Sequence, residues 1–427
     1  MALQPSGNLL CSAWSCSYVR TAGVTGQQLL DSRTAWIRLS AIIALSSLGG
    51  VGMWSVIVTL PYVQAEFGVS RGAASLPYTL TMLGFGAGGI LMGRLADRYG
   101  VMRPLLGATL MLALGYVAAG LAPSLAIYTL AQGVMIGMLG ASAAFAPLVA
   151  DASLWFQRRR GIAVALAASG NYLAGAVWPP VLTWLIGFYG WRMAHLAVGA
   201  ICLVTMVPLA LMLRARAPGS RGDGFAGHPG EAKPLGLSRN ALTAILCCAG
   251  VACCVAMAMP QVHIVAYCGD LGYGVARGAE MLSVMLACGI VSRIGSGFIA
   301  DLIGGLPTLM LGSVLQGAAL SLFLFFDGLT SLFALSALFG LVQGGIVPSY
   351  AVIVRESFPA SEVGMRVGIV LMATLGGMAL GGWLSGVIFD VTGSYAAAFL
   401  NGVIWNAVNM AIVTTLMLRR RVHLAPA

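Results

Sequence analysis

Apolar runs of about twenty residues follow one another along this chain, and the charged residues are concentrated in the gaps between them. A helix needs about 20 predominantly apolar residues to cross the hydrocarbon core of a bilayer. Only 8% of the residues are charged, whereas about a quarter are charged in a soluble domain. We therefore expect an all-α membrane protein with twelve transmembrane helices. The twelve runs lie at 37–60, 73–96, 102–121, 125–150, 161–188, 192–213, 240–264, 278–300, 305–326, 331–354, 364–388 and 394–418.

The twelve runs divide into two sets of six. Residues 214–239 separate the sets and are rich in Gly, Pro and charge, which is typical of a flexible linker. GRLADRYG follows the second run, and GFIADLIGG follows the eighth, at the matching place in the other set. Such internal repeats are typical of secondary transporters, with a central site between two pseudo-symmetric six-helix bundles. The expected parts are an N-terminal tail (1–36), a first bundle (37–213), the linker (214–239), a second bundle (240–418) and a C-terminal tail (419–427).

The arginines predict the orientation of these bundles. Most of them fall in the two tails, the linker and every second loop, and the other side receives only Arg71, Arg192 and Arg277. Because Lys and Arg accumulate in cytoplasmic loops, we expect both termini in the cytosol. The expected location is the bacterial inner membrane.

Other classes of function find little support in the sequence. The net charge of +10 is spread over loops, whereas a nucleic-acid binder gathers its basic residues on one face. GFGAGG at 84–89 lies inside an apolar run with no preceding strand, so it is not a nucleotide-binding loop. The cysteines show no metal-ligand spacing. We expect no enzyme, catalytic residue, cofactor, metal or nucleic-acid partner, and a chain that works as a monomer in the lipid bilayer.

GRLADRYG (93–100) resembles the signature of the major facilitator superfamily between its second and third helices. The chain is also similar to the monocarboxylate transporter and oxalate/formate antiporter branch of that superfamily. This similarity lies in residues 65–100, in WFQRRRGIAVALAASGNYLAGAVWPP (155–180), in MPQVHIVAYCGDLGY (259–273) and in SRIGSGFIAD (292–301). The resemblance implies the major facilitator fold and transport by alternating access.

The resemblance also implies a latch at the cytosolic end of the second helix. A carboxylate there can accept hydrogen bonds from the N-terminus of a neighbouring helix, and a glycine allows that helix to approach. The alternative is a helix cap in a loop that only sets the orientation. The expected gating residues are Gly93, Arg94, Asp97 and Arg98, with Gly297 and Asp301 in the second half.

Arg293 lies in the middle of an apolar run, eight residues and about 12 Å before Asp301. A guanidinium keeps its proton in proteins, so a cation at this depth needs an anion or water. No acidic residue of the sequence is expected at the same depth, and a carboxylate matches the guanidinium fork in two parallel hydrogen bonds. Arg293 is therefore predicted to bind the carboxylate of a small organic anion, as the resemblance also implies. The alternative is an arginine satisfied by backbone carbonyls or water.

Within the eleventh run, the stretch GIVLMATLGGMALGGWLSGVIF (368–389) contains no Lys or Arg, although the oxalate exchangers that the chain resembles have a lysine there. One cation indicates a monoanion. Proton coupling would also need a titratable group, and Asp270 and His263 at the end of the seventh run are the two candidates. Each could equally be a loop or interface residue without this role. Five polar residues could line the pocket or bridge helices: Tyr62, Asn171, Tyr172, Gln343 and Tyr350.

The sequence thus predicts a carrier that moves a lactate- or pyruvate-like monocarboxylate together with a proton. An organic-anion exchanger, or an efflux carrier for drugs or organic acids, is the alternative within the same superfamily. A non-transporting membrane sensor is a third possibility, although the tails and linker are short for a signalling domain.

Overall fold

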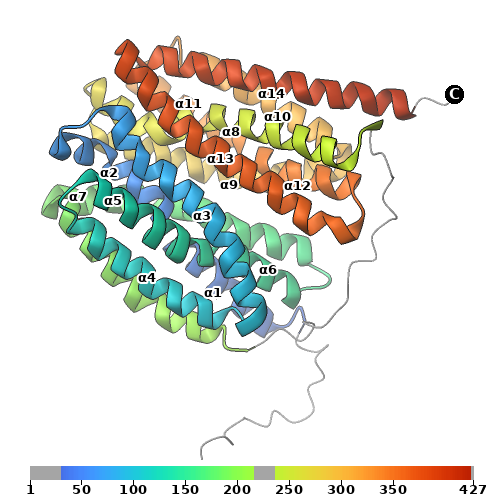
Figure 1. Ribbon diagram of the computed structural model, residues 1–427, viewed down its shortest axis with the longest axis horizontal. Coiled ribbons are helices and arrows are strands. Elements are labelled where there is room, and N and C mark those ends of the chain that lie inside the picture. Colours follow the sequence, from blue (N-terminus) through green and yellow to red (C-terminus); the bar gives the residue numbers. More distant parts are fainter. Residues whose placement is uncertain (1–29, 216–235, 425–427) are drawn as a thin grey trace, which may run out of the picture.

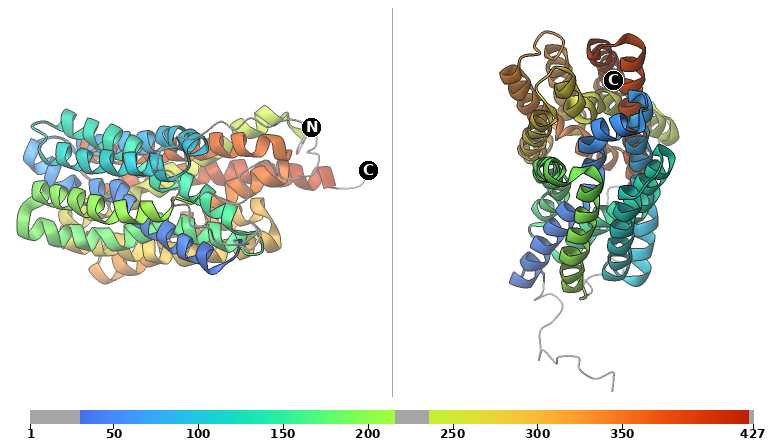
Figure 2. Two further views of the ribbon diagram at one scale, coloured as in Figure 1. Left: turned by 90° about the horizontal axis from the view of Figure 1, so that it is seen from below. Right: turned by 90° about the vertical axis from the view of Figure 1, so that its left-hand side faces the viewer.

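The protein is a bundle of helices that run roughly along its longest axis (Figures 1 and 2). The computed structural model describes residues 30–215 and 236–424, and every regular element within them is a helix. Most of the expected N-terminal tail and linker, and the last residues of the expected C-terminal tail, lie outside the described residues.

The described residues contain eleven helical segments that are long and apolar enough to cross a membrane. One of them, α7, holds two spans that meet at Gly190, so the twelve predicted spans are present in the predicted order. The elements before the linker are α1 (Arg33–Gly49), α2 (Val51–Phe67), α3 (Arg71–Tyr99), α4 (Met102–Gly120), α5 (Leu125–Leu130), η2 (Ala131–Gly140), η3 (Ala141–Ala144), α6 (Ala146–Trp155) and α7 (Arg160–Met212). Those after it are α8 (Arg239–Asp270), α9 (Val275–Ile303), α10 (Gly305–Leu322), α11 (Leu329–Gln343), α12 (Ile346–Ser357), α13 (Ala360–Thr392) and α14 (Tyr395–Leu424).

Three of the spans are interrupted. The first breaks between α1 and α2 at Gly50, the fourth passes through the π-helix η2, and the tenth breaks between α11 and α12 at Gly344 and Gly345. Irregular backbone at membrane depth is tolerated where it is buried in protein or lines a cavity. In transporters such breaks often occur near the substrate site.

Gly190 makes the turn within α7 possible. Its φ of 76° and ψ of 162° belong to a region that is essentially restricted to glycine. We expect Gly190→Ala to lower the free energy of unfolding by about 1–3 kcal/mol, measured by thermal or denaturant unfolding of the purified protein. Gly187→Ala is the matched control, because Gly187 is helical and a Cβ there meets no atom within 4 Å. Equal effects of the two substitutions would contradict the prediction.

We call the end of the molecule at which α3 finishes and α13 begins the linker end, and the other end the distal end. The two halves pack tightly near the distal end, where a Cβ on Gly72 of α3 would lie 2.8 Å from Val387 of α13. Midway along the same pair, Gly86 still packs against Met372. Nearer the linker end, a Cβ on Gly93 or Gly364 would meet nothing within 4 Å. The helices α3 and α13 therefore diverge toward the linker end, as Figure 1 shows.

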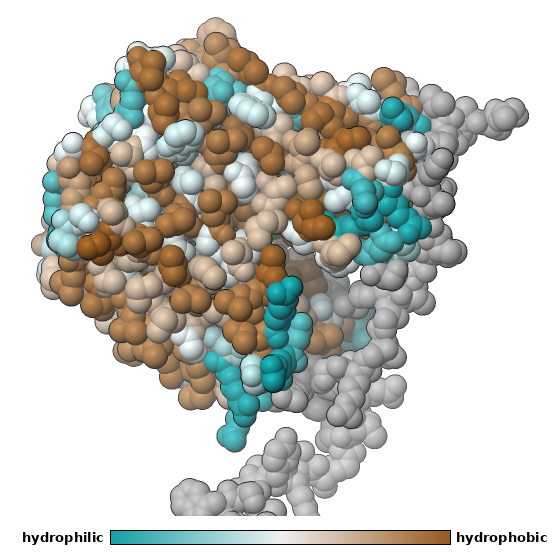
Figure 3. Space-filling model, viewed as in Figure 1, coloured by the Kyte–Doolittle hydropathy of each residue, from teal (hydrophilic) through white to brown (hydrophobic). Residues whose placement is uncertain are grey.

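The second seam between the halves, formed by α7 and α9, is also closely packed in its middle part and open toward the linker end. Gly175 packs against Leu286, and Gly289 packs against Tyr172. Gly161 and Gly297, closer to the linker end, have open space around them. Figure 3, which faces the seam between α3 and α13, shows the surface hollowed toward the linker end between two hydrophilic patches. The structure is closed at the distal end and open at the linker end.

Candidate functional site

Arg293 lies on α9, 18 residues after the helix begins and ten before it ends. Its Nη1 donates a 3.3 Å hydrogen bond to the carbonyl of Ala168, and its guanidinium lies over the ring of Tyr172, 5.0 Å from the ring centre. Both partners are uncharged, and both belong to α7 in the other half. Within residues 30–215 and 236–424 this half-buried arginine forms no ion pair. The charge of Arg293 is therefore left without a carboxylate in the described part of the chain.

Two glycines fix the surroundings of Arg293. Gly289, one turn earlier on α9, leaves room for the ring of Tyr172, which a Cβ there would meet at 2.5 Å. Gly344 at the break after α11 lies so close to α9 that a Cβ added to it would come 3.0 Å from the backbone nitrogen of Arg293. The interrupted tenth span and the fifth span thus both reach α9 beside the cation. Arg293 thus lies on α9 between the closely packed Gly289 and the open Gly297, where the two halves begin to separate toward the linker end.

Gln343 and Asn171 are the sequence neighbours of Gly344 and Tyr172, which contact α9. Gln343, the residue before Gly344, is buried, and its Oε1 accepts a 2.7 Å hydrogen bond from Gln261 of α8. Its own Nε2 is buried without a partner in the described chain, so a donor is left for another acceptor. Asn171 is half-buried, and its backbone carbonyl accepts a hydrogen bond from the indole of Trp54. The substrate roles of Asn171, Tyr172 and Gln343 remain predictions that fit this arrangement.

The other two predicted lining residues are placed differently. Tyr62 is half-buried on α2 and makes no side-chain hydrogen bond within the described residues. Tyr350 is fully buried on α12, and its hydroxyl donates to Asn409 of α14, which in turn donates to Ser313 of α10. The Tyr350 hydroxyl thus bridges helices inside the C-terminal half, as the alternative interpretation expected. A substrate role for Tyr350 remains an untested prediction.

Asp270 and His263 belong to one connected network at the distal end. Asp270 forms an ion pair with Arg71 of α3, with distances of 3.0 and 3.1 Å. Arg71 also donates a 2.6 Å hydrogen bond to the hydroxyl of Tyr395, which lies 3.2 Å from Nδ1 of His263. Nε2 of His263 lies 2.8 Å from the carbonyl of Gly382 and therefore donates, which leaves Nδ1 to accept from the tyrosine. The two predicted proton carriers are thus linked through Arg71 and Tyr395, away from Arg293.

The predicted gating residues lie around the opening at the linker end. Arg94, Asp97, Arg98 and Asp301 are exposed, and none makes an ion pair or side-chain hydrogen bond within the described residues. A Cβ on Gly93 or Gly297 would meet nothing within 4 Å. The structure therefore shows these residues apart from any partner helix, and their latch role remains a prediction. The distal end differs, because its arginines 71, 192 and 277 are all paired with carboxylates.

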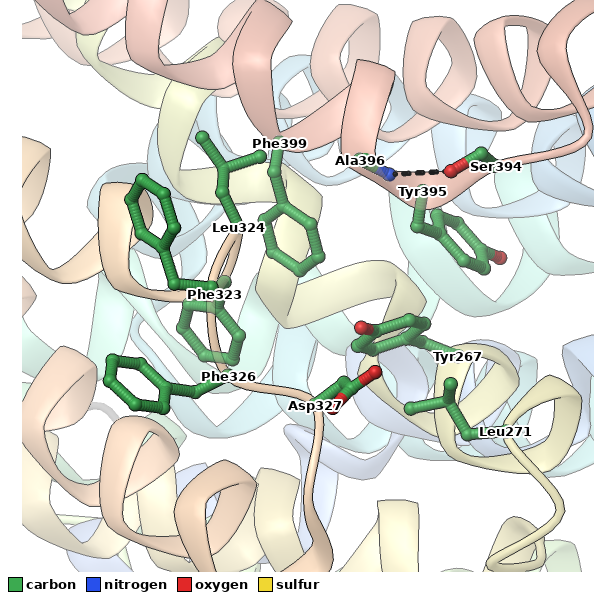
Figure 4. Close-up of a pocket in the computed structure, with 11 residues that line it drawn as sticks. Tyr267, Leu271, Phe323, Leu324, Phe326, Asp327, Ser394, Tyr395, Ala396 and Phe399 are labelled. Atoms are coloured by element: carbon green, nitrogen blue, oxygen red, sulfur yellow. Dashed lines mark hydrogen bonds between the residues drawn. The ribbon is translucent and has the colours of Figure 1, made fainter.

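A cavity of about 270 Å³ lies at the distal end of the C-terminal half, beside this network (Figure 4). Aromatic side chains form most of its wall, and Asp327 and Tyr395 contribute polar atoms. Arg293 and the residues in contact with it do not line this cavity. The cavity is therefore separate from the candidate substrate site.

Sequence reasoning missed several partners in these sites. Trp54 and Gln261 lie within apolar runs, and a lone polar or indole group in such a run was the only available signal. In the sequence, Arg71 indicates only the orientation of the chain in the membrane, and no pattern indicates a role for Asp390. Each of these residues acquires its partner from a different span, so no local pattern could reveal the contact.

Comparison with known proteins identifies the family. A model of the Major Facilitator Superfamily matches residues 42–326 and 281–426, and the chain belongs to this superfamily of membrane transporters. A solved structure of a peptide transporter has the same fold, with a TM-score of 0.70 at 13% identity over 92% of this chain and 99% of that one. The chain is therefore an integral, multi-pass membrane protein.

Two relatives identify the branch of the superfamily to which the chain belongs. Monocarboxylate transporter 13 of Bos taurus is 32% identical over 308 residues, which is 72% of this chain and 71% of the relative. Monocarboxylate transporter 11 of Mus musculus is 28% identical over 384 residues, covering 87% and 84%. These matches confirm the monocarboxylate transporter branch of the superfamily. Because both relatives are from mammals, they lend no support to the expected bacterial inner membrane, which remains untested.

Proposed function

We propose that this protein carries a small monocarboxylate, such as a lactate- or pyruvate-like acid, together with a proton by alternating access. Arg293 is the residue that binds the carboxylate. The linker end faces the cytosol, so the conformation described here is open to the cytosol.

The observation that carries this proposal is the uncompensated charge of Arg293. A central Arg costs about 2.5–3.5 kcal/mol on insertion scales, and its two observed partners are a carbonyl and an aromatic ring. A substrate carboxylate would supply the missing anion in a bidentate geometry. Because Ala168 and Tyr172 belong to the other half, the position of the Arg293 guanidinium depends on how the two halves are arranged. The binding of an anion to Arg293 would depend on that arrangement too. Binding and the conformational change would then be coupled through one side chain.

A monoanion fits this site better than a dianion. The only cation of α13 is Arg366 near the linker end, and its Nε donates a 2.7 Å hydrogen bond to Glu362. Arg366 also donates to the backbone carbonyl of Arg239. A second carboxylate of a substrate would find no free cation on this helix.

The network at the distal end supplies the proton step of the proposal. Protonation of Asp270 removes the negative charge that pairs with Arg71, and this weakens a contact between the two halves. His263 is the second possible carrier, reached from Arg71 through Tyr395. Proton binding would thus favour opening of the distal end, where substrate and proton enter together.

We expect proteoliposomes containing the purified protein to alkalinise the outside medium when one monocarboxylate of a panel is added. Lactate, pyruvate and related 2-hydroxy and 2-keto acids form the panel, and a pH-sensitive dye outside the vesicles gives the readout. Empty liposomes control for passive diffusion of the protonated acids. Uptake of a labelled acid without any pH change, and only against a preloaded anion, would instead identify an exchanger. The absence of both signals across the panel would contradict the proposal.

A further inference from the structure

The cavity of about 270 Å³ at the distal end, which we call the distal cavity, lies where three helices of the C-terminal half end or begin (Figure 4). Its wall includes Tyr267 near the end of α8, residues 323–327 just after α10, and Tyr395 and Phe399 at the start of α14. The C-terminus of a helix carries a partial negative charge, and the N-terminus carries a partial positive one. Two C-termini therefore meet one N-terminus at this cavity, which favours a cation.

Asp327 places a full negative charge on the same wall. It is exposed, and it makes no hydrogen bond or ion pair within the described residues. Among the described residues that line the distal cavity, none is Lys, Arg or His. Figure 4 shows the Asp327 carboxylate turned toward Tyr267, whose hydroxyl has no hydrogen-bond partner in the described part of the chain. The wall thus offers a carboxylate without a counter-cation.

The arginine behind this wall is already neutralised. Arg71 donates a 2.6 Å hydrogen bond to the Tyr395 hydroxyl and forms its ion pair with Asp270. Asp390 lies beside it, and the two Asp390 oxygens accept hydrogen bonds of 2.7 Å each from the backbone N–H groups of Arg71 and Gly72, which cap the start of α3. One guanidinium therefore stands beside two carboxylates, and Asp327 adds a third negative charge.

The aromatic rings of the wall form corners. The ring of Tyr267 meets that of Tyr395 at 75° with centres 5.3 Å apart, and that of Phe399 at 70° with centres 5.6 Å apart. Phe323 stacks on Phe399, with ring centres 5.0 Å apart. The face of each ring is electrically negative, and rings at steep angles can surround a quaternary ammonium from more than one side. The volume suits a small cation, because pockets for drug-sized ligands are about 300–1,000 Å³.

We infer that the distal cavity binds a quaternary ammonium group, with the rings of Tyr267 and Phe399 against its methyl groups and Asp327 as its counter-anion. The group can belong to a free small cation or to the choline headgroup of a lipid. The lipid source is included because Phe325 and Phe326, next to Asp327, are 76% and 50% exposed, which is typical of the membrane–water interface. Since Arg293 and its partners do not line this cavity, the inference does not rest on the proposed transport function.

Choline is the probe that tests the inference, on the purified full-length protein in a maltoside detergent, which carries no ammonium group. Saturation-transfer NMR of the choline methyl signal should show saturable binding with a Kd of about 1 mM or lower. The alcohol 3,3-dimethyl-1-butanol has nearly the same shape without the charge, and it should bind at least about tenfold more weakly. Equal binding of the two compounds would show that the cavity only takes up apolar groups, and this result would overturn the inference.

Three variants separate the contributions of the charge and the ring. Asp327→Asn should raise the Kd of choline about tenfold because the counter-anion is lost. Tyr267→Leu should raise it by a similar factor, whereas Tyr267→Phe keeps the ring and should stay within about twofold of the parent. Glu280→Gln is the matched control, since Glu280 is an exposed carboxylate at the same end that does not line the cavity. Size-exclusion profiles establish that each variant is folded.

Competition with short-chain lipids distinguishes the two sources of the ammonium group. Displacement of choline by phosphatidylcholine, but not by phosphatidylglycerol with the same chains, would identify a lipid headgroup as the occupant. Displacement by neither lipid would identify a free cation. Equal displacement by both would show that acyl chains fill the cavity and would contradict the inference. The absence of saturable choline binding below about 10 mM, or a parental Kd in both Asp327→Asn and Tyr267→Leu, would contradict it as well.

Discussion

Replacing Arg293 with glutamine is expected to lower the initial rate of monocarboxylate uptake by about 100-fold. A charge-assisted hydrogen bond contributes about 1.5–3 kcal/mol, and a bidentate pair combines two of them. Glutamine keeps most of the length and the polarity but removes the charge that the substrate carboxylate needs. Arg293→Lys keeps the charge and loses the planar fork, so we expect an intermediate loss of about tenfold. Uptake of the acid identified in the proteoliposome assay measures both variants.

The matched control is Arg277→Gln on the same helix. Arg277 forms an exposed ion pair with Glu280 at the distal end, and such pairs contribute little. Its uptake rate should therefore remain near normal. Arg293→Met adds a second readout, because removal of a half-buried cation with no ionic partner in the described chain should leave the thermal stability unchanged or raised. Near-normal affinity in both Arg293→Lys and Arg293→Gln would exclude the proposed role.

The spans of this fold could be predicted from the sequence because the bilayer imposes a length on each apolar run. The prediction placed the fifth and sixth spans at 161–188 and 192–213, and in the structure the two helical parts of α7 meet at the non-helical turn at Gly190, between these ranges. Arg293 could be singled out for the same reason, since a cation inside an apolar run needs an explanation regardless of its partners. Both inferences use local composition alone. The structure confirms the spans and places Arg293 within α9, and the substrate role of Arg293 remains a prediction.

Side-chain partners could not be predicted in this way. Asp270 was expected to be a loop acid or a proton carrier, and its ion pair with Arg71 joins residues separated by 199 positions. Asp390 acquires its role only because α13 lies against α3 at the distal end. Tyr350 was expected either to line the substrate pocket or to bridge helices, and only the structure shows that its hydroxyl is bonded to Asn409 within the C-terminal half. Which end of the molecule is open is likewise a property of the packed halves and not of any single segment.

The largest expected loss of stability concerns the buried ion pair between Arg38 of α1 and Asp151 of α6. The Arg38 and Asp151 side chains are 5% and 6% exposed and are joined by two hydrogen bonds of 2.7 and 3.0 Å. Arg38 also donates to the carbonyl of Leu213, just after α7, so the pair connects three segments of the N-terminal half at the linker end. Asp151→Ala should lower the free energy of unfolding by about 3–5 kcal/mol, because it leaves a buried cation without its partner. Denaturant unfolding of the purified protein in detergent measures the change.

Two comparisons separate the lost pairing from a general effect of removing a carboxylate. Glu280→Ala breaks an exposed pair and should change the stability by less than about 1 kcal/mol. Replacing both partners, as Arg38→Met with Asp151→Leu, should restore most of the stability, since apolar side chains remove both buried charges together. A double variant as unstable as Asp151→Ala would show that the hydrogen bonds themselves, and not the unpaired charge, determine the loss. Because the contacts of this pair among the described residues lie within the N-terminal half, the double variant should still transport, in contrast to Arg293→Gln.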